Sequence, residues 1–203
     1  MAGGLPIVYR SGSGNLTFNV DYFDYAANAG IKKFYAGGSE MSGATVYFLT
    51  PNKTSSGADV LIISAQNATT TGTYDLTFNN PVQVAAADAI AEFTTFGNTA
   101  TQDVRVTISH VRGSTVTTLG VKDLAQRAMG ANEYSRESMV IPLTAQAFAV
   151  GDILRLAVAV RETANQLSKV YTDPSSRRTF TENGTGATIG SDFALSMPFK
   201  IDL

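Results

Sequence analysis

The sequence of 203 residues contains no cysteine, no tryptophan and a single histidine, His110. Without cysteine the chain can form neither disulfides nor thiolate metal sites. A site of converging imidazoles needs several histidines, so we expect no metal ion and no cofactor. Because His110 follows Val104, Val106 and Ile108 in strand phase, we expect it to point inward or to cap a strand end, with its hydrogen bonds satisfied.

Charged residues are also scarce, at 16% of the chain, with a net charge of −2. Nucleic-acid binders usually carry a basic stripe, whereas the adjacent basic pairs here are only Lys32-Lys33 and Arg177-Arg178. No apolar run approaches the roughly 20 residues of a membrane helix. The first four residues lack the charged and apolar regions of a signal peptide. We therefore expect no nucleic acid or membrane partner, and synthesis in the host cytoplasm.

Motifs that carry catalytic chemistry are missing as well. The sequence contains no G-x-S-x-G elbow and no phosphate-cradling G-x-x-x-x-G-K-[ST]. Asp21 and Asp24 have opposite strand parity and would diverge, while Glu133 and Glu137 flank Arg136 as a surface charge cluster. These absences predict a protein that is not an enzyme and has no catalytic residue. His110→Ala is the cheapest test of the enzymatic alternative, because no other histidine can substitute for it.

What the chain does contain is typical of β-structure. It has 24 threonines, which fit a pleated surface, and 18 glycines that supply turns. Apolar residues alternate with polar ones over residues 16–22, 74–79, 104–109, 154–161 and 193–203. The sequence predicts an all-β, jelly-roll-like antiparallel β-sandwich with little helix. Residues 1–15 are predicted to form a flexible N-terminal arm, and residues 16–203 a single domain.

Several local predictions refine this fold. Residues 45–50 and 60–64 are apolar on both parities, which fits strands covered on both faces or strands at an interface. Pro142 and Pro198 are expected at edges or bulges, because proline donates no ladder hydrogen bond. Residues 122–129 are the best candidate for a short helix, whereas residues 82–92 are ambiguous between helix and strand. Asn183-Gly184 could close a tight hairpin within a long polar connection over residues 165–190.

With catalytic and cofactor chemistry set aside, recognition through protein surfaces remains. Apolar residues on both strand parities, few charges and glycine-rich arms suit a subunit that is stable among neighbours. Three stretches support a more specific hypothesis: residues 30–35 (GIKKFY), residues 147–156 (AFAVGDILRL) and residues 196–203 (SMPFKIDL). Together they resemble the jelly-roll virion proteins of tailed bacteriophages, in particular capsid decoration (cement) proteins.

This resemblance implies a role on the outer surface of a phage capsid, where the protein would bind between capsomers and stabilise the shell. The implied partners are further copies of the chain, with a trimer favoured, and the major capsid protein of the same particle. The lack of a long helix argues against the major capsid protein itself. Two alternatives remain open: a receptor- or glycan-binding β-module of a tail fibre or spike, and another minor head or tail structural protein.

Three regions are candidates for the contact surface. The first is the N-terminal arm, residues 2–15. The second comprises Ile31, Lys32, Lys33, Phe34 and Tyr35, which mix two lysines with apolar residues as an interface rim does. The third is the connection over residues 173–190, with Arg177 and Arg178 as its candidate contact residues.

Overall fold

The computed structural model describes residues 29–41, 44–53, 60–64, 68–97, 101–124, 127–128, 130–162 and 168–200. Within these ranges the regular elements are β-strands, and none is a helix. They are β1 (Ala29–Met41), β2 (Ala44–Thr50), β3 (Val60–Ser64), β4 (Thr69–Thr77), β5 (Val82–Val84), β6 (Asp88–Gly97), β7 (Thr101–Arg112), β8 (Thr115–Asp123), β9 (Arg127–Ala128), β10 (Glu133–Pro142), β11 (Gln146–Phe148), β12 (Ile153–Glu162), β13 (Ser168–Thr172), β14 (Thr179–Thr181), β15 (Thr188–Gly190) and β16 (Phe193–Lys200). The predicted all-β class is confirmed.

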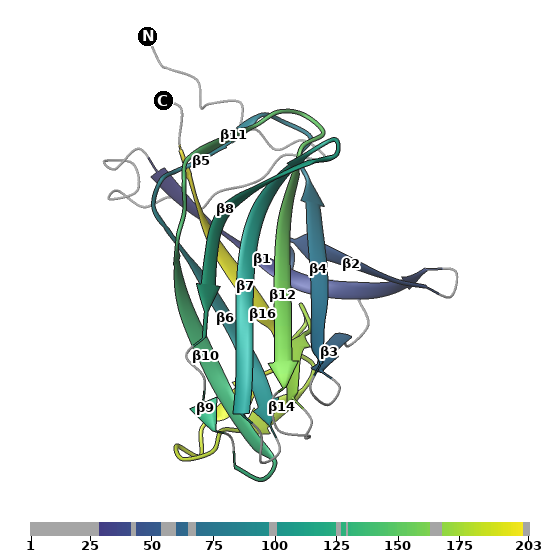
Figure 1. Cartoon of the computed structure of the whole chain (residues 1–203), viewed down its shortest axis with the longest axis vertical. Coiled ribbons are helices and arrows are strands. Elements are labelled where there is room, and N and C mark those ends of the chain that lie inside the picture. The colour runs from purple at the N-terminus through teal and green to yellow at the C-terminus, as the bar shows by residue number, and fades with distance from the viewer. Residues whose placement is uncertain are drawn as a thin grey trace.

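Most of these strands form one sheet that curls back on itself. Its order is β3-β13-β6-β16-β1-β2-β4-β12-β7-β8, with β10 beside β6, β9 beside β7, and β5 between β11 and β16. The ladders are antiparallel except for one parallel bridge between β2 and β4. In Figure 1, β8, β7, β12 and β4 form a layer in front of β6, β16 and β1. The predicted jelly-roll-like sandwich is thereby confirmed, as a sheet nearly closed into a barrel.

The hydrophobic core lies between these two layers. Alternation accounts for it: Leu154, Leu156, Val158 and Val160 of β12 are all fully buried, and the residues between them face outward. From the opposite layer, Phe93 of β6 and Phe193 of β16 stack with ring centroids 5.0 Å apart. The strands predicted over residues 74–79, 104–109, 154–161 and 193–203 correspond to β4, β7, β12 and β16.

The position of β16 differs from the expectation of a half-buried strand. It runs between β1 and β6, and both its parities are largely buried, including Ala194 and Pro198. We had predicted that Pro198 lies at a sheet edge or a bulge. The structure shows that it does not lie at a sheet edge. At this point the strand that neighbours β16 on one side changes. β6 pairs with β16 as far as Ser196, and β5 pairs with β16 at Phe199. Its missing N–H is tolerated there, while its carbonyl accepts a hydrogen bond from Ala85 at 3.1 Å.

The two layers approach each other again where β8 meets the end of β10. Pro142 is the last residue of β10, which pairs with β6 alone among the described strands, so the predicted edge position is confirmed for this proline. Thr144 donates a backbone hydrogen bond to the carbonyl of Leu119 at 3.0 Å. Leu119 is the extra residue of a bulge in β8, since Ile108 pairs with Gly120 and the next residue of β7 pairs with Thr118.

The predicted helix over residues 122–129 is wrong. Lys122 and Asp123 continue β8 along β7, and Arg127–Ala128 form the short strand β9 on the same neighbour. Tertiary pairing with the long strand β7 overrides the local helical preference of the alanines. The ambiguous residues 82–92 form β5 and the start of β6. The arm at residues 1–15, the strand at 16–22 with Asp21 and Asp24, and residues 201–203 lie outside the described residues.

Candidate functional site

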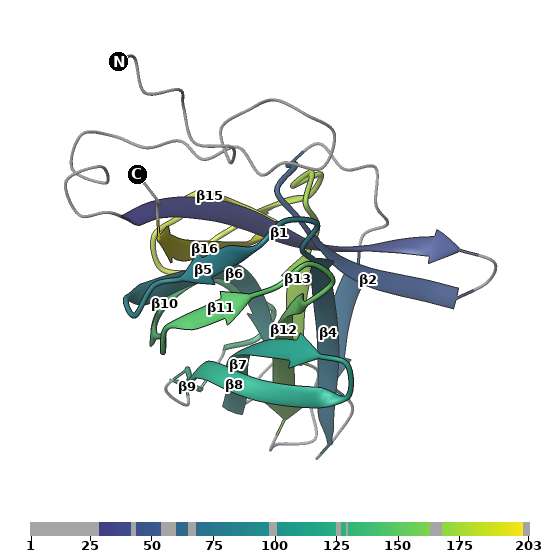
Figure 2. The ribbon, with the colours of Figure 1, turned by 90° about the horizontal axis from the view of Figure 1, so that it is seen from above.

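The strands β1 and β2 form a two-stranded ribbon that leaves the body of the protein. β1 pairs with β16 only from Ala29 to Ala36. From Gly37 to Met41 it pairs only with β2, whose single bridge to β4 is at Phe48. Figures 1 and 2 show this part of the hairpin extending away from the sandwich. Among the described strands, neither outer edge of the projecting ribbon has a ladder partner.

The base of this ribbon is fixed to the body by close packing. A Cβ atom added to Gly37 would lie 2.8 Å from Cδ of Pro174 and 3.3 Å from the ring of Phe48, so only glycine fits beneath the proline. Leu49 is buried, and the ring of Tyr47 packs edge-on against Tyr74 at 5.5 Å between centroids. The ribbon therefore starts from an ordered base, and its direction is set by the body.

The predicted contact segment at residues 31–35 divides between the two faces of β1. Ile31, Lys33 and Tyr35 have the outward parity, and Ile31 is 53% exposed. Phe34 is fully buried in the core, so its assignment to the interface is corrected. Lys32 has the inward parity and is half-buried, and this burial lowers the pKa of Lys32.

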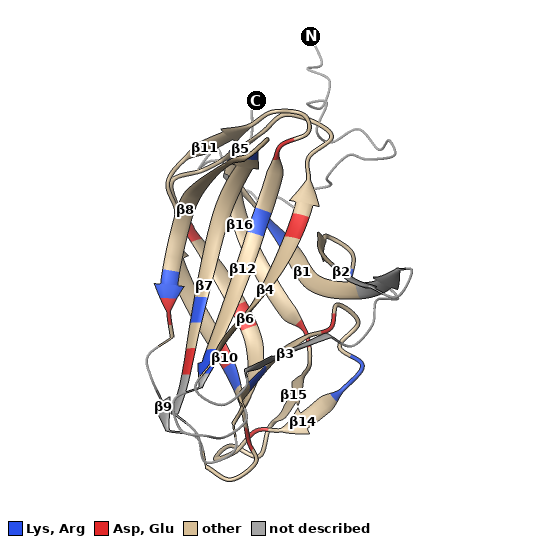
Figure 3. Ribbon diagram, turned by 45° about the vertical axis from the view of Figure 1, so that its right-hand side comes forward, with Lys and Arg blue, Asp and Glu red and all other residues tan. Residues whose placement is uncertain are grey.

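Two further exposed aliphatic side chains, Ile90 and Val140, lie on the same face as these outward residues. Val140 pairs with Ile90, Ile90 with Ser196, and Ser196 with Lys33, so the four side chains form a row across β10, β6, β16 and β1. Val140 is 50% and Ile90 38% exposed. On the same face, Lys33 forms an exposed ion pair with Glu92 at 3.1 Å. Figure 3 shows charges of both signs spread singly along the strands.

The predicted contact residues Arg177 and Arg178 lie in a loop organised by a buried carboxylate. Asp173 is fully buried and accepts hydrogen bonds from the backbone N–H of Ser175 and of Arg177, at 3.1 and 2.7 Å. Burial raises the pKa of Asp173, but these hydrogen bonds and the guanidinium of Arg177 more than offset it, so the pKa lies below its ordinary value. Arg177 thus helps to build the loop, while its side chain and that of Arg178 stay exposed.

The hairpin of β14 and β15 follows this loop and is anchored by aromatic rings. Phe180 of β14 stacks on Tyr134 at 4.4 Å and packs against Tyr171 at 4.5 Å. A turn does lie at Asn183-Gly184, with a positive φ of 87° at Gly184. The predicted tight hairpin is not formed, because the last ladder pair is Thr181 with Thr188 and residues 182–187 connect the two strands. These contacts make the hairpin part of the fold rather than a loose outer loop.

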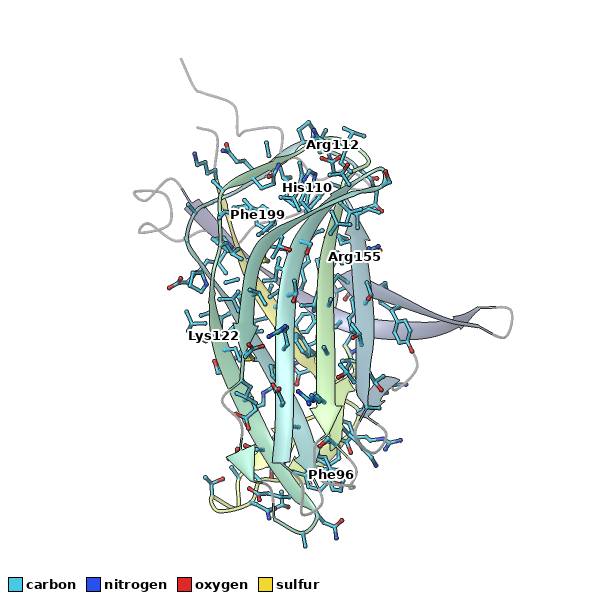
Figure 4. The ribbon with its side chains drawn as sticks, in the orientation of Figure 1. Phe96, His110, Arg112, Lys122, Arg155 and Phe199 are labelled. Atoms are coloured by element: carbon cyan, nitrogen blue, oxygen red, sulfur yellow. The ribbon has the colours of Figure 1, made fainter. Side chains whose placement is uncertain are left out.

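A polar cluster at the other end of the body surrounds the single histidine. Nε2 of His110 lies 2.7 Å from Oδ2 of Asp152, and Arg112 donates to the same carboxylate at 2.6 Å. The ring of His110 packs edge-on against Phe148 at 4.5 Å. Figure 4 shows His110 and Arg112 near one end of the strands and Phe96 near the opposite end. The prediction of a buried, hydrogen-bonded histidine is confirmed, since it is 5% exposed.

This cluster explains the F-x-x-G-D stretch on which the resemblance partly rests. Asp152 accepts the N–H of Ala149 at 2.8 Å, and Gly151 takes the positive φ of 86° that the turn requires. The hydrogen bond from Arg112 is the main reason why the pKa of Asp152 lies well below its ordinary value of 3.8 despite burial. The hydrogen bonds with the N–H of Ala149 and with His110 lower this pKa further. Asp152 therefore locks the turn before β12 onto the end of β7, which is a structural role.

The chemistry available to this cluster is limited. In the described ranges Nε2 of His110 bonds to Asp152, and no hydroxyl nucleophile is bonded to its ring. The same ranges hold no group of three histidine, aspartate or glutamate side chains able to bind a metal ion. No described segment forms a helix with the length and apolarity needed to cross a membrane.

Comparison with known proteins gives similarity of fold only. No family model matches the chain, and no curated protein matches its sequence. Solved structures do: a CocE/NonD family hydrolase from Staphylococcus aureus superposes with a TM-score of 0.54 at 11% identity, over 85% of this chain and 37% of the hydrolase. An alpha-amino acid ester hydrolase gives 0.53 at 11% identity, over 83% of this chain and 36% of that chain. An aminopeptidase from a marine sediment archaeon, Thaumarchaeota archaeon, gives 0.51 at 8% identity, over 83% and 37%.

These neighbours contradict our prediction that the chain is not an enzyme. Two of the structures that share its fold are hydrolases and a third is an aminopeptidase, so the fold occurs within enzymes. The chain spans little more than a third of the length of each of them. At 8 to 11% identity the similarity establishes the fold alone. None of the motifs considered in the sequence had indicated a similarity to these enzymes.

Proposed function

We propose that this protein is a structural component of a virus particle that binds other protein subunits through its β1–β2 ribbon. In this role it decorates the outer surface of a phage capsid, binds between capsomers and forms an oligomer, with a trimer favoured. The observation that carries the proposal is the ribbon itself. A two-stranded hairpin is at best marginally stable alone in water, so a ribbon that projects without ladder partners is suited to a neighbour.

Two further features support this proposal. The ribbon sequence from Gly37 to Phe48 carries one charge, Glu40, and low charge is typical of the centre of an obligate interface. Among the described strands, neither edge of the ribbon from Gly37 to Tyr47 has a ladder partner, so its backbone groups can add to a sheet of another subunit. On a capsid lattice many copies bind at once, so that modest contacts of each ribbon add up through multivalency.

Co-sedimentation with empty capsid shells tests this function. We compare the wild-type protein with a variant in which residues 39–46 are replaced by a two-residue Asn-Gly turn, which keeps Gly37, Phe48 and the packing of Tyr47 on Tyr74 at the base. A matched control, Val121→Ser, removes an exposed apolar side chain from β8, on the other layer. The proposal predicts that wild type and V121S sediment with shells and that the ribbon variant stays in solution. Equal binding by all three would refute the role of the ribbon.

The hydrolase neighbours favour a second candidate function. As this sandwich corresponds to little more than a third of each neighbour, it can serve as the β part of a longer hydrolytic protein. Under this candidate His110, paired with Asp152, is the available general base. Turnover of p-nitrophenyl acetate by the purified chain, lost in His110→Ala and kept in the exposed control Arg105→Ala, would favour it. Equal rates in both variants would count against a hydrolytic role of His110.

A further inference from the structure

We propose that Asn183 is a site of spontaneous covalent modification, at which the folded protein converts an asparagine into aspartate and isoaspartate. The site lies at the tip of the connection between β14 and β15, and it does not depend on the function proposed for the ribbon. Asparagine is among the chemically labile residues of proteins. Of the eleven asparagines in the sequence, Asn183 is followed by glycine and the other ten are not.

The reaction needs only these two residues and solvent water. The main-chain nitrogen of Gly184 gives up its proton and attacks Cγ of the Asn183 carboxamide, and the new C–N bond closes a five-membered succinimide ring. The bond from Cγ to Nδ2 then breaks, and Nδ2 leaves with the proton as ammonia. Water opens the ring at one of its two carbonyl carbons. The product is aspartate, or isoaspartate when the main chain is rerouted through the former side chain.

The structure leaves both reacting groups accessible. Asn183 and Gly184 are exposed, and among the described residues neither the Asn183 carboxamide nor the N–H of Gly184 has a hydrogen-bond partner. A Cβ atom added to Gly184 would meet nothing within 4 Å, so the space beside this residue is open. Glycine has no side chain to block the approach of its own nitrogen. Because the two groups belong to adjacent residues, the attack is intramolecular and gains from their proximity.

The hydrogen bonds that hold this turn do not use the two reacting groups. The main-chain N–H of Asn183 donates to the carbonyl of Tyr134 at 3.1 Å, and that of Gly186 donates to the carbonyl of Glu182 at 3.0 Å. The N–H of Glu182 donates to the carbonyl of Ala187 at 2.8 Å. The connection is therefore tied at its ends while its tip stays open to water. Conversion adds one negative charge at this tip, and isoaspartate also adds a methylene group to the main chain.

Asn132 offers a natural control within the same molecule. It is exposed and has a positive φ of 56°, so it too lies in a turn. The residue after it is Glu133, whose own side chain flanks the attacking nitrogen and whose main chain enters the β10 ladder opposite Gly97. Neither hindrance exists at Gly184. We therefore expect conversion at Asn183 to outpace conversion at Asn132.

Ageing of the purified full chain at mildly alkaline pH, which promotes loss of the amide proton, tests this inference. Isoelectric focusing follows the added negative charge. Mass spectrometry of digests locates it, because conversion changes the mass of a peptide by the water gained less the ammonia lost. Two variants are aged beside the wild type: Asn183→Gln, whose longer side chain cannot close the five-membered ring, and Asn183→Asp, which marks the charge of the product. A further wild-type sample is aged unfolded in urea.

The proposal predicts an acidic species of folded wild type that grows with time, focuses with Asn183→Asp and grows faster than any acidic species of Asn183→Gln. The peptide that contains Asn183 should carry the change, and the peptide that contains Asn132 should lag behind it. The proposal is overturned if the folded protein keeps Asn183 intact while the chain in urea converts it, because the turn would then protect the site. Equal conversion at Asn132, or no conversion in either sample, overturns it as well.

Discussion

The substitution Gly120→Ala provides a test of the packing in which the sign of the effect is informative. In an ordinary strand position, replacing glycine with alanine stabilises a protein by about 0.4–1 kcal/mol, because glycine has more conformational freedom in the unfolded chain. Gly120 differs because β8 meets β10 there. A Cβ atom would lie 2.6 Å from the carbonyl oxygen of Pro142 and 2.9 Å from Cγ2 of Ile141.

The first of these contacts is with backbone, so no side-chain rotation can relieve it. Forcing an extra methyl group into a packed interior costs about 1–3 kcal/mol. Set against the usual gain, we expect Gly120→Ala to lose about 1 kcal/mol of the free energy of unfolding. For a chain of this size that lowers the melting temperature by about 2–4 °C.

Thermal unfolding followed by circular dichroism measures this change, with all proteins at one concentration because association shifts the melting temperature. The matched control is Thr117→Ala, an exposed position on the same strand, for which we expect a change within about 0.5 kcal/mol. A Gly120→Ala protein that melts above wild type would show that β8 and β10 do not approach as closely as described. The closure of the sandwich would then have to be revised.

Three other substitutions test separate parts of the account. Phe34→Ala should cost about 3–5 kcal/mol in urea unfolding, because Phe34 is fully buried, whereas Ile31→Ala three residues away on the opposite face should change little. Tyr74→Phe removes the hydroxyl that donates to Thr172 at 3.1 Å and should cost about 1 kcal/mol in the same assay. Because the folded pKa of Asp152 is lowered, its carboxylate stabilises the protein above its ordinary pKa, and this contribution is lost as the pH falls below 4. Asp152→Asn should therefore be less stable than wild type at pH 7, with the difference narrowing toward pH 2, and a constant difference would argue against the linkage.

The strands were predictable wherever one face of the sheet is buried. In β7 and β12 every second side chain enters the core, so apolar residues recur at every second position of the sequence. The same rule could not place β16, because both of its parities are largely buried and alternation carries no information about neighbours. The prediction of a helix over residues 122–129 was wrong for a related reason. The helical preference of a few alanines is weaker than strand pairing with β7.

The candidate site was only partly predictable. Sequence placed residues 31–35 at a contact surface, but a strand sends alternate residues to opposite faces, and Phe34 therefore belongs to the core. The exposed face also needs Ile90 and Val140, which are far apart in sequence and meet through the pairing of β6 with β10. Residues 45–50 belong to β2, which pairs with β1 and has a single bridge to β4 at Phe48, and their predicted place at an interface stays a prediction. Nothing in the sequence had indicated the similarity of fold to solved hydrolases, where the identity is only 8 to 11%.

The mass of the purified protein in solution, measured by light scattering beside the variant with residues 39–46 replaced, is the most direct test of the central claim. The account predicts a stable oligomer for wild type, with a trimer favoured, and a folded monomer of 21.4 kDa or slightly less for the ribbon variant. A wild-type monomer, or an oligomer that persists unchanged without the ribbon, would contradict the claim that the ribbon binds neighbouring copies.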